Sequence, residues 1–485
     1  MTNEREQLIN DAYAAVEKHQ QIVDADPYRL RYHIMSPVGL LNDPNGFIQW
    51  QGVYHLFYQW SPLKVGHGLK YWGHYTSHNL VGWKHEKIAL APSDWFDKNG
   101  CYSGSAVTDE GKLKLFYTGN VKDEQGNRET YQCLAESSDG LCFEKKGVVV
   151  ELPSGYTAHF RDPKVWQHKN GLWYMVVGAQ SNDLQGKAVL FTSSDLKDWE
   201  LVGEVSGSNT EQLNDFGYMW ECPDLFDLNG KDILIVSPQG LEQDGILYNN
   251  VYQSGYFVGK LNYKTGKLTH GDFTELDRGF EFYAPQTTID EHGRRLMFAW
   301  MGVPEQDEDK HPTVAAGWLH TMTIPRELLL DGEKLIQKPV IELQELRHNE
   351  VSYENVSFKA NRMQSLQEVE GDSLELNLFL KKIEAETFEI NIRNNAKIIY
   401  NRNEELLTLE RISFATRQVE ARHCKLKGLQ QLTLFLDTSS IEMFVNGGEE
   451  VFSARFFPDP KNTSLTFYSY RGDVIGDVQK WKLSI

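Results

Sequence analysis

The sequence predicts an all-β protein: a five-bladed β-propeller followed by a C-terminal antiparallel β-sandwich, with a short N-terminal helix. Three repeating features predict the propeller. Acidic residues recur at intervals of about 60 residues or twice that, and glycine-containing turns recur at nearly the same interval. Turns that begin with Asn or Asp and end with an aromatic residue are the third feature. Because three kinds of marker share one period, we expect one blade per repeat.

The first expected element is a helix over residues 3–24. Leu8, Ile9 and Val16 are among apolar residues that recur there at helical spacing. Long helical patterns do not return further along the chain. Residues 1–27 are therefore predicted to form an N-terminal helical segment.

The propeller is predicted over residues 28–340. Short runs rich in aromatic and β-branched residues each follow a turn that contains glycine, which is typical of strands entered from tight turns. Five such runs predict five blades. The runs are 53–58, 113–117, 172–177, 233–236 and 295–300, and the preceding glycines are Gly52, Gly111, Gly171, Gly230 and Gly293.

The sandwich is predicted over residues 350–485, where the long period is lost. Polar and apolar residues alternate there, as in 374–378 and 388–392, and Asn446-Gly447 indicates a hairpin. Such alternation with frequent turns is typical of an antiparallel sandwich. No cluster of catalytic residue types occurs in this part, so we expect a stabilising or oligomerising module.

Composition excludes several classes of partner. The 485 residues include 49 Lys and Arg against 68 Asp and Glu, a net charge of −19, which argues against nucleic acid or anionic membrane. No apolar run approaches the roughly 18 residues of a membrane span, and the N-terminal stretch lacks an apolar signal region. Five scattered cysteines favour free thiols in a reducing compartment. We expect a cytoplasmic protein with no metal and no cofactor; a homo-oligomer is left open.

The periodic acids are the predicted source of chemistry. Asp43, Asp162, Glu221 and Glu281 fall near multiples of the repeat, and Ser103 occupies the position where one acid is missing. On the inner strands of successive blades, these side chains would point at one central pocket. Carboxylates gathered in one pocket are typical of glycoside hydrolysis.

Three motifs in register resemble the signatures of glycoside hydrolase family 32, which contains invertases, fructan hydrolases and sucrose-6-phosphate hydrolases. They are Asn-Asp-Pro-Asn-Gly at 42–46, Arg-Asp-Pro at 161–163 and Glu-Cys-Pro at 221–223. The resemblance runs from about residue 28 to the C-terminus. Further matching segments are 102–105, 282–284, 324–328 and 437–442.

The resemblance implies a retaining mechanism in which Asp43 is the nucleophile, Glu221 is the general acid/base, and Asp162 holds the fructosyl hydroxyls and stabilises the transition state. Such a mechanism requires one carboxylate to be ionised and another protonated. We expect Asn42 and nearby backbone amides to keep Asp43 ionised. Apolar neighbours and the other carboxylates are expected to raise the pKa of Glu221.

The resemblance also implies a set of sugar contacts. Trp300 is expected to stack on a sugar face, and Tyr102 and Ser103 to line the fructosyl site. Glu281 is expected either to contact a hydroxyl group or to be structural. The full set of substrate-binding residues is Leu40, Leu41, Asn42, Gln59, Tyr102, Ser103, Arg161, Glu281 and Trp300.

One departure from the family pattern bears on the substrate. His67 stands where members often have tryptophan, and Lys64 and Lys70 flank it. These three are the expected phosphate or aglycone contacts, because cations bind phosphate well; the alternative is a solvated basic loop. The leading hypothesis is hydrolysis of sucrose 6-phosphate, with sucrose also accepted.

Other functions are kept as alternatives. The nearest is a cytoplasmic β-fructosidase acting on fructans or fructo-oligosaccharides, and transfructosylation could accompany either activity. An inverting hydrolase of the arabinan type is disfavoured by the motif at 42–46 and by the sandwich. A non-catalytic sugar-binding propeller is disfavoured because it would need no pair of nucleophile and acid.

Overall fold

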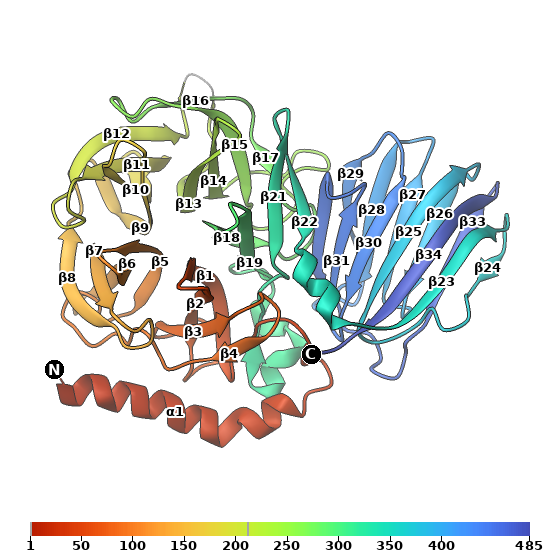
Figure 1. The fold of residues 1–485 in the computed structure, drawn as a ribbon, viewed down its shortest axis with the longest axis horizontal. Coiled ribbons are helices and arrows are strands. Elements are labelled where there is room, and N and C mark those ends of the chain that lie inside the picture. The colour runs from red at the N-terminus through yellow and green to blue at the C-terminus, as the bar shows by residue number, and fades with distance from the viewer. Residues whose placement is uncertain (1, 211–212) are drawn as a thin grey trace.

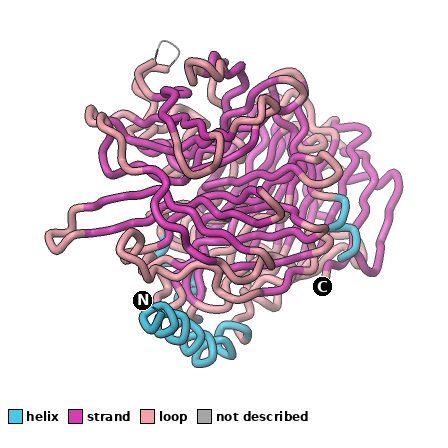
Figure 2. Tube along the Cα trace, turned by 60° about the vertical axis from the view of Figure 1, so that its left-hand side comes forward, coloured by secondary structure: helices cyan, strands magenta, loops and turns pink. Residues whose placement is uncertain are grey.

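The computed structural model describes residues 2–210 and 213–485. The chain forms one long helix, five sheets arranged like the blades of a propeller, and a sandwich of two further sheets (Figure 1). Strands make up most of the regular structure, and the helix lies at one edge of the molecule (Figure 2). The predicted all-β class, with its propeller and sandwich, is confirmed.

Helix α1 (Thr2–Asp24) packs along the outside of the propeller. Ala12 is fully buried, and Leu8, Ile9 and Val16 pack against the core cluster formed by the first and fifth blades. These positions form one apolar stripe on a helix that is otherwise mostly polar. Its stability therefore comes from packing more than from helix propensity.

The first four blades each follow chain order from the inner strand to the outer one. Their innermost strands contact one another around the centre. The strands are, in blade one, β1 (Gly39–Trp50), β2 (Val53–Ser61), β3 (Tyr71–Ser77) and β4 (Trp83–His85); in blade two, β5 (Cys101–Asp109), β6 (Lys112–Lys122), β7 (Arg128–Ser137) and β8 (Glu144–Val150); in blade three, β9 (Tyr156–Gln167), β10 (Trp173–Ser181), β11 (Gly186–Ser193) and β12 (Glu200–Gly207); and in blade four, β13 (Met219–Leu228), β14 (Lys231–Gln239), β15 (Gly255–Leu261), β16 (Leu268–His270) and β17 (Thr274–Glu275).

The fifth blade closes the ring. A segment inserted within it carries a strand that pairs in parallel with β1, with Gly39 opposite Trp318 and Leu40 opposite Leu319. This pairing joins the last blade to the first. The blade contains β18 (Tyr283–Ile289), β19 (Arg295–Trp300), β21 (Arg326–Asp331) and β22 (Lys334–Pro339), and the insertion contains η1 (Glu308–Lys310), η2 (Pro312–Ala316) and β20 (Trp318–Leu319).

The repeating glycines occupy the turns between the first and second strands of the blades. All five have φ between 76° and 85°, a left-handed conformation in which glycine is strongly favoured. An added Cβ would meet nothing within 4 Å at any of them. The backbone conformation, and not lack of space, therefore explains the repeated glycine.

The sandwich consists of two six-stranded antiparallel sheets that share one core. Alternate residues of β25 and β26 are buried in that core, as the sequence pattern predicts. One sheet contains β23 (Arg347–Phe358), β34 (Val474–Leu483), β25 (Leu374–Ile383), β30 (Gln431–Leu436), β31 (Ser440–Val445) and β32 (Glu450–Arg455); the other contains β24 (Met363–Gln364), β33 (Leu465–Tyr470), β26 (Thr387–Ile392), β27 (Ala396–Asn401), β28 (Leu406–Ile412) and β29 (Val419–Lys425); η3 (Ile341–Leu346) precedes them.

Buried ion pairs join the propeller to the sandwich. Arg326 of the fifth blade binds Asp277 at 3.0 Å and Glu442 of the sandwich at 2.6 Å, and all three side chains are fully buried. Burial leaves these charges no water, so their pairing fixes how the two domains meet. In the part of the chain that the structure describes, no helix is long and apolar enough to span a lipid bilayer.

Candidate active site

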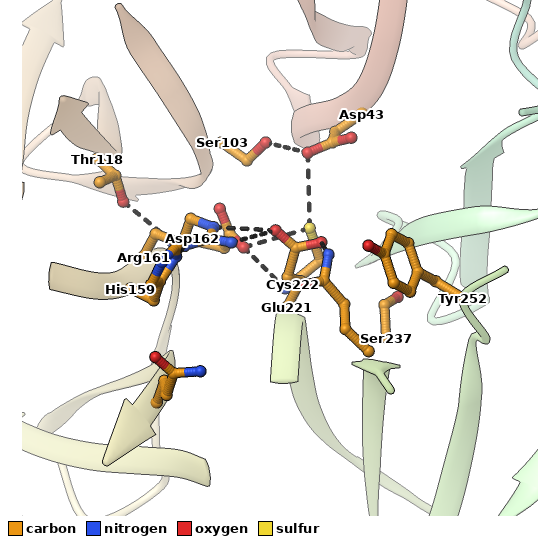
Figure 3. Close-up of polar contacts among 12 residues, drawn as sticks. Asp43, Ser103, Thr118, His159, Arg161, Asp162, Glu221, Cys222, Ser237 and Tyr252 are labelled. Carbon is orange, nitrogen blue, oxygen red and sulfur yellow. Dashed lines mark hydrogen bonds and ion pairs between the residues drawn. The ribbon is translucent and has the colours of Figure 1, made fainter. Parts of the chain in front are cut away.

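A cavity of about 700 Å³ opens at the centre of the propeller, and all five blades contribute side chains to it. The innermost strands supply Asp43 from β1, Asp162 from β9, Glu221 from β13 and Tyr283 from β18. Three of the four periodic acids therefore share one cavity, and Figure 3 shows them around Cys222.

Each innermost strand has an irregularity at its motif, where its pairing with the second strand shifts register. Asp162 and Cys222 have positive φ, at 69° and 47°. Such bulges re-aim side chains and tolerate proline, which cannot donate to the ladder. The prolines that follow the acids therefore lie at bulges within the strands.

Asp43 is held by a closed ring of hydrogen bonds. Asn42 donates to Asp43 Oδ1 at 3.1 Å and to Gln59 Oε1 at 3.0 Å. Gln59 donates in turn to Ser103 Oγ at 2.8 Å, and Ser103 donates to Asp43 Oδ2 at 2.5 Å. Both carboxylate oxygens are thereby oriented. Burial nevertheless raises the pKa of Asp43, against these hydrogen bonds and with the help of the charge on Glu221.

Asp162 is held by hydrogen bonds to its backbone and to its carboxylate. Its backbone N–H donates to Thr118 Oγ1 at 2.9 Å, and its Oδ2 accepts from the Cys222 N–H at 2.9 Å. Burial raises the pKa of Asp162 to about 7; Arg161 opposes the rise, and the charges of Glu221 and Asp43 add to it.

Glu221 is surrounded by donors. Arg161 donates twice to Oε1, at 2.9 and 2.6 Å, while Gln239 and Tyr283 donate to Oε2 at 2.8 and 2.6 Å. Although burial acts to raise it, the charge of Arg161 and the bond from Tyr283 lower the pKa of Glu221. This direction is opposite to the one expected from the sequence, because the donors on Arg161, Gln239 and Tyr283 converge only in the fold.

The three acids titrate as one group, since each carries charge close to the others. The guanidinium of Arg161 and the Lys70 amine, whose pKa burial lowers to about 7, do not fully neutralise three carboxylates. Because burial raises the pKa of Asp162 to about 7 while Arg161 lowers that of Glu221, a proton held near neutral pH lies on Asp162 and not on Glu221.

Cys222 bridges two of the acids without being a nucleophile. Its Sγ lies 3.6 Å from Asp43 Oδ2 and 3.5 Å from Asp162 Oδ2. Burial and the three neighbouring carboxylates raise the pKa of the thiol well above its usual value. The thiol stays protonated and acts as a weak hydrogen-bond donor.

Several expected sugar contacts do line the cavity: Asn42, Gln59, Tyr102, Arg161 and Trp300. Trp300 is only 1% exposed, so it offers little ring surface for stacking, and its buried Nε1 donates to no described residue. Arg161 bonds Glu221 and not its sequence neighbour Asp162.

Four expected contacts lie elsewhere. Leu40 and Leu41 are fully buried in β1, with Leu41 in the core cluster. Ser103 is 2% exposed and acts on Asp43, because its hydroxyl is committed to that carboxylate. Glu281 bonds Arg411 of the sandwich at 2.7 Å and the Arg455 N–H at 2.7 Å. Its structural alternative is the one that the geometry supports.

The three expected phosphate contacts differ in where they lie and in what they bond. Lys64 is exposed and is not among the described residues that line the cavity. Lys70 lines it but is 4% exposed and donates to Asn42 Oδ1 at 2.6 Å; burial lowers its pKa to about 7. His67 lies at the rim with Nε2 3.2 Å from Glu308.

Sequence reasoning missed several cavity residues. Tyr283 lies in the segment 282–284 that resembles the family, but no role was predicted for it. Asn120 and Gln239 each stand nine residues after the turn glycine of their blade. That second repeat of amides was a usable signal. Lys122, Arg128 and His159 left none, because only the fold brings them to the cavity. No described group of His, Cys, Asp or Glu is arranged to hold a metal ion.

Comparisons with known proteins agree with this geometry. The glycosyl hydrolases family 32 N-terminal domain matches residues 33–339, and the family 32 C-terminal domain matches 342–483. The chain is 57% identical to a sucrose-6-phosphate hydrolase of Bacillus subtilis, over 96% of each chain, and 45% identical to one of Salmonella typhimurium, over 92% of each. A solved sucrose-6-phosphate hydrolase of Lactobacillus gasseri superposes with a TM-score of 0.88 at 31% identity, covering 97% of this chain and 96% of that one. A GH32 β-fructofuranosidase of Bombyx mori superposes with a TM-score of 0.86 at 34% identity, covering 99% and 98%.

Proposed function

The chain belongs to glycosyl hydrolase family 32, and from this premise we propose that it hydrolyses sucrose 6-phosphate, and more slowly sucrose, to fructose and glucose 6-phosphate or glucose. The proposed substrate rests on the 57% identity, over 96% of the chain, to a sucrose-6-phosphate hydrolase. The cavity of about 700 Å³ agrees in size, since pockets for one small ligand span roughly 300–1,000 Å³.

The proposed chemistry is double displacement with retention. Asp43 attacks the anomeric carbon of the fructosyl unit, and the bond to the glycosidic oxygen breaks as Glu221 gives that oxygen a proton. Glu221 then takes a proton from water, which attacks the fructosyl-enzyme ester and releases Asp43 as a carboxylate. The ring of donors around Asp43 supports its role, because it fixes both oxygens before attack.

The proton on Glu221 has to come from within the cluster. Fructosyl hydroxyls that donate to Asp162 stabilise its ionised form and lower its pKa, so the shared proton moves toward Glu221. When Glu221 carries a proton on one oxygen, the other oxygen keeps its donors: Gln239 and Tyr283 if the proton is on Oε1, or Arg161 if it is on Oε2. Binding of the sugar would therefore also protonate the general acid, Glu221.

A phosphorylated sugar also suggests where the enzyme works. A charged sugar phosphate does not cross a lipid bilayer unaided, so its hydrolase belongs in the compartment where the phosphate is added. All five cysteines are described as free thiols, which fits the reducing cytoplasm. We place the activity there.

The test of the substrate compares kcat/KM for sucrose 6-phosphate, sucrose, 1-kestose and inulin on one enzyme preparation. The proposal expects the order sucrose 6-phosphate, then sucrose, then the longer chains. A higher value for 1-kestose than for sucrose 6-phosphate would favour a fructo-oligosaccharide hydrolase instead. The anomer released first, followed by NMR, separates retention from inversion.

A further inference from the structure

The β6–β7 hairpin places two cations at the cavity that no acid neutralises. Lys122 ends β6 and Arg128 begins β7, and both line the cavity. Within the described residues, neither forms an ion pair. Arg161 and Lys70, which also line the cavity, already have partners: Arg161 pairs with Glu221, and Lys70 donates to Asn42.

The pairing of this hairpin makes the arrangement unfavourable by itself. Lys122 lies directly opposite Arg128 in the antiparallel register, so both side chains emerge on one face. Like charges directly opposite each other destabilise a ladder. Among the described residues, no acid of the hairpin pairs with either cation: Asp123 is bonded within the turn to Asn127, Glu129 accepts from Tyr131, and Glu124 is exposed on the turn. An anion between the two cations would relieve this repulsion.

A hydrogen bond anchors the hairpin at the cavity, and strand β6 of the hairpin also contacts one of the proposed catalytic acids. Lys122 N–H donates to Asn99 Oδ1 at 2.7 Å, and Thr118, on the same face of β6, accepts from the Asp162 N–H. Lys122 therefore stands four residues, about 13 Å along the strand, beyond the residue that touches the acids. Between them, Asn120 is fully buried in the cavity wall, and its Oδ1 accepts from no described donor.

Arg128 lies in the cavity wall near Tyr102 and His159. Its guanidinium is 5.7 Å from the centre of the Tyr102 ring, and its charge is felt at His159, which bonds Arg161. Because Arg161 donates to His159 Nδ1, the proton of the neutral imidazole is on Nε2, which leaves a third donor for an anion. Arg161 also holds Glu221, the proposed donor to the leaving group.

We propose that Lys122, Arg128 and His159 form the subsite for the phosphate of the leaving glucose 6-phosphate. This inference rests on the proposed function and names the residues that set its preference for a phosphomonoester. A phosphate with a charge between −1 and −2 matches two cations and one neutral donor. The three cations near residue 67 are less suitable phosphate ligands. His67 and Lys70 already bond Glu308 and Asn42, and Lys64 lies outside the cavity.

The experiment compares Lys122→Gln, Arg128→Gln and the double variant with Lys64→Gln, which removes an exposed cation outside the cavity. For each, the ratio of kcat/KM for sucrose 6-phosphate to that for sucrose is measured, and thermal melting checks folding. Loss of a charge-assisted hydrogen bond predicts that each hairpin variant lowers the ratio about tenfold and the double variant at least 30-fold. Lys64→Gln should keep the wild-type ratio.

The two hypotheses fail in different ways. If the wild type prefers sucrose 6-phosphate and the double variant keeps that preference, the hairpin subsite is wrong and the proposed function stands. If the wild type shows no preference, the proposed function is wrong, and the subsite is judged by inhibition of sucrose hydrolysis. Glucose 6-phosphate should then inhibit the wild type better than glucose does; equal inhibition of the wild type and the double variant would overturn the subsite.

Discussion

Two groups of buried carboxylates in this molecule are in opposite electrostatic situations. In the cavity, Asp43, Asp162 and Glu221 face one guanidinium, that of Arg161, and the Lys70 amine, whose pKa burial lowers to about 7. At the domain interface, Arg326 pairs with Asp277 and Glu442, while Arg411 and the Arg455 N–H hold Glu281. Glu281 falls on the same period as the cavity acids, yet it belongs to the interface.

The difference shows that the ratio of acids to cations decides what a buried acid does. At the interface, where three arginines (Arg326, Arg411 and Arg455) meet three acids, the charges are neutralised and the contacts fix how the two domains meet. Where acids exceed cations, one proton is retained near neutral pH and can be moved. The excess is unfavourable for stability, and it is what acid–base chemistry requires.

Replacement of the nucleophile should give the largest effect. Asp43→Asn preserves shape and most hydrogen bonds but removes the attacking charge, so kcat should fall at least about 10⁴-fold. The melting temperature should stay the same or rise, because one of three repelling charges is gone. Turnover within tenfold of wild type, measured with sucrose 6-phosphate, would contradict the role of Asp43.

The matching change at the interface should do the reverse. Glu281→Gln removes the buried acid that Arg411 binds and leaves Arg411 with the partly exposed Glu420 as its remaining acid, which costs about 3 kcal/mol of stability. The urea midpoint should drop, while kcat of the folded enzyme stays close to wild type. An unchanged midpoint together with reduced kcat would return Glu281 to the active site.

Loss of a donor to Asp43 should have an intermediate effect. Ser103→Ala removes the hydrogen bond at 2.5 Å, and a bond to a charged group is worth about 1.5–3 kcal/mol, so kcat/KM should fall about 10–100-fold. The pKa of Asp43 should rise, which moves the acid limb of the pH profile to higher pH. In the Asp43→Asn background, the same change should add little, because the two residues act together.

The pH profile should show the smallest effects. The cluster must hold one proton, and Asp162 has a pKa of about 7, so kcat/KM should decline as pH rises above about 7. Tyr283→Phe removes a bond that favours ionised Glu221, so the pKa of Glu221 rises and the alkaline limb should move to higher pH. A limb that moves to lower pH would contradict the proposed proton sharing.

Much of the site could be predicted because a propeller repeats its local structure. The period of about 60 residues located Asp43, Ser103, Asp162 and Glu221, and hydrogen bonds now join Ser103 to Asp43 across that same separation. Repeats place equivalent strand positions next to one another around the centre. Periodicity alone, however, could not distinguish Glu281 from the acids of the cavity.

Properties that depend on neighbours from other blades could not be predicted from the sequence. The pKa of Glu221 was expected to be high, but Arg161, Gln239 and Tyr283 come from three different strands to lower it. Likewise, Lys64 and Lys70 lie close to His67 in sequence, but one is exposed outside the cavity and the other is buried against Asn42.

The sequence by itself determined the repeat, the two-domain β architecture and the identities of the three acids, because glycine turns, alternation and motif order are local properties of the chain. The tertiary structure alone decided the charge balance around each acid and the meeting of Lys122 with Arg128 at the cavity. Electrostatic energies depend on distances through space and on burial, and neither is encoded in the spacing of residues along the chain.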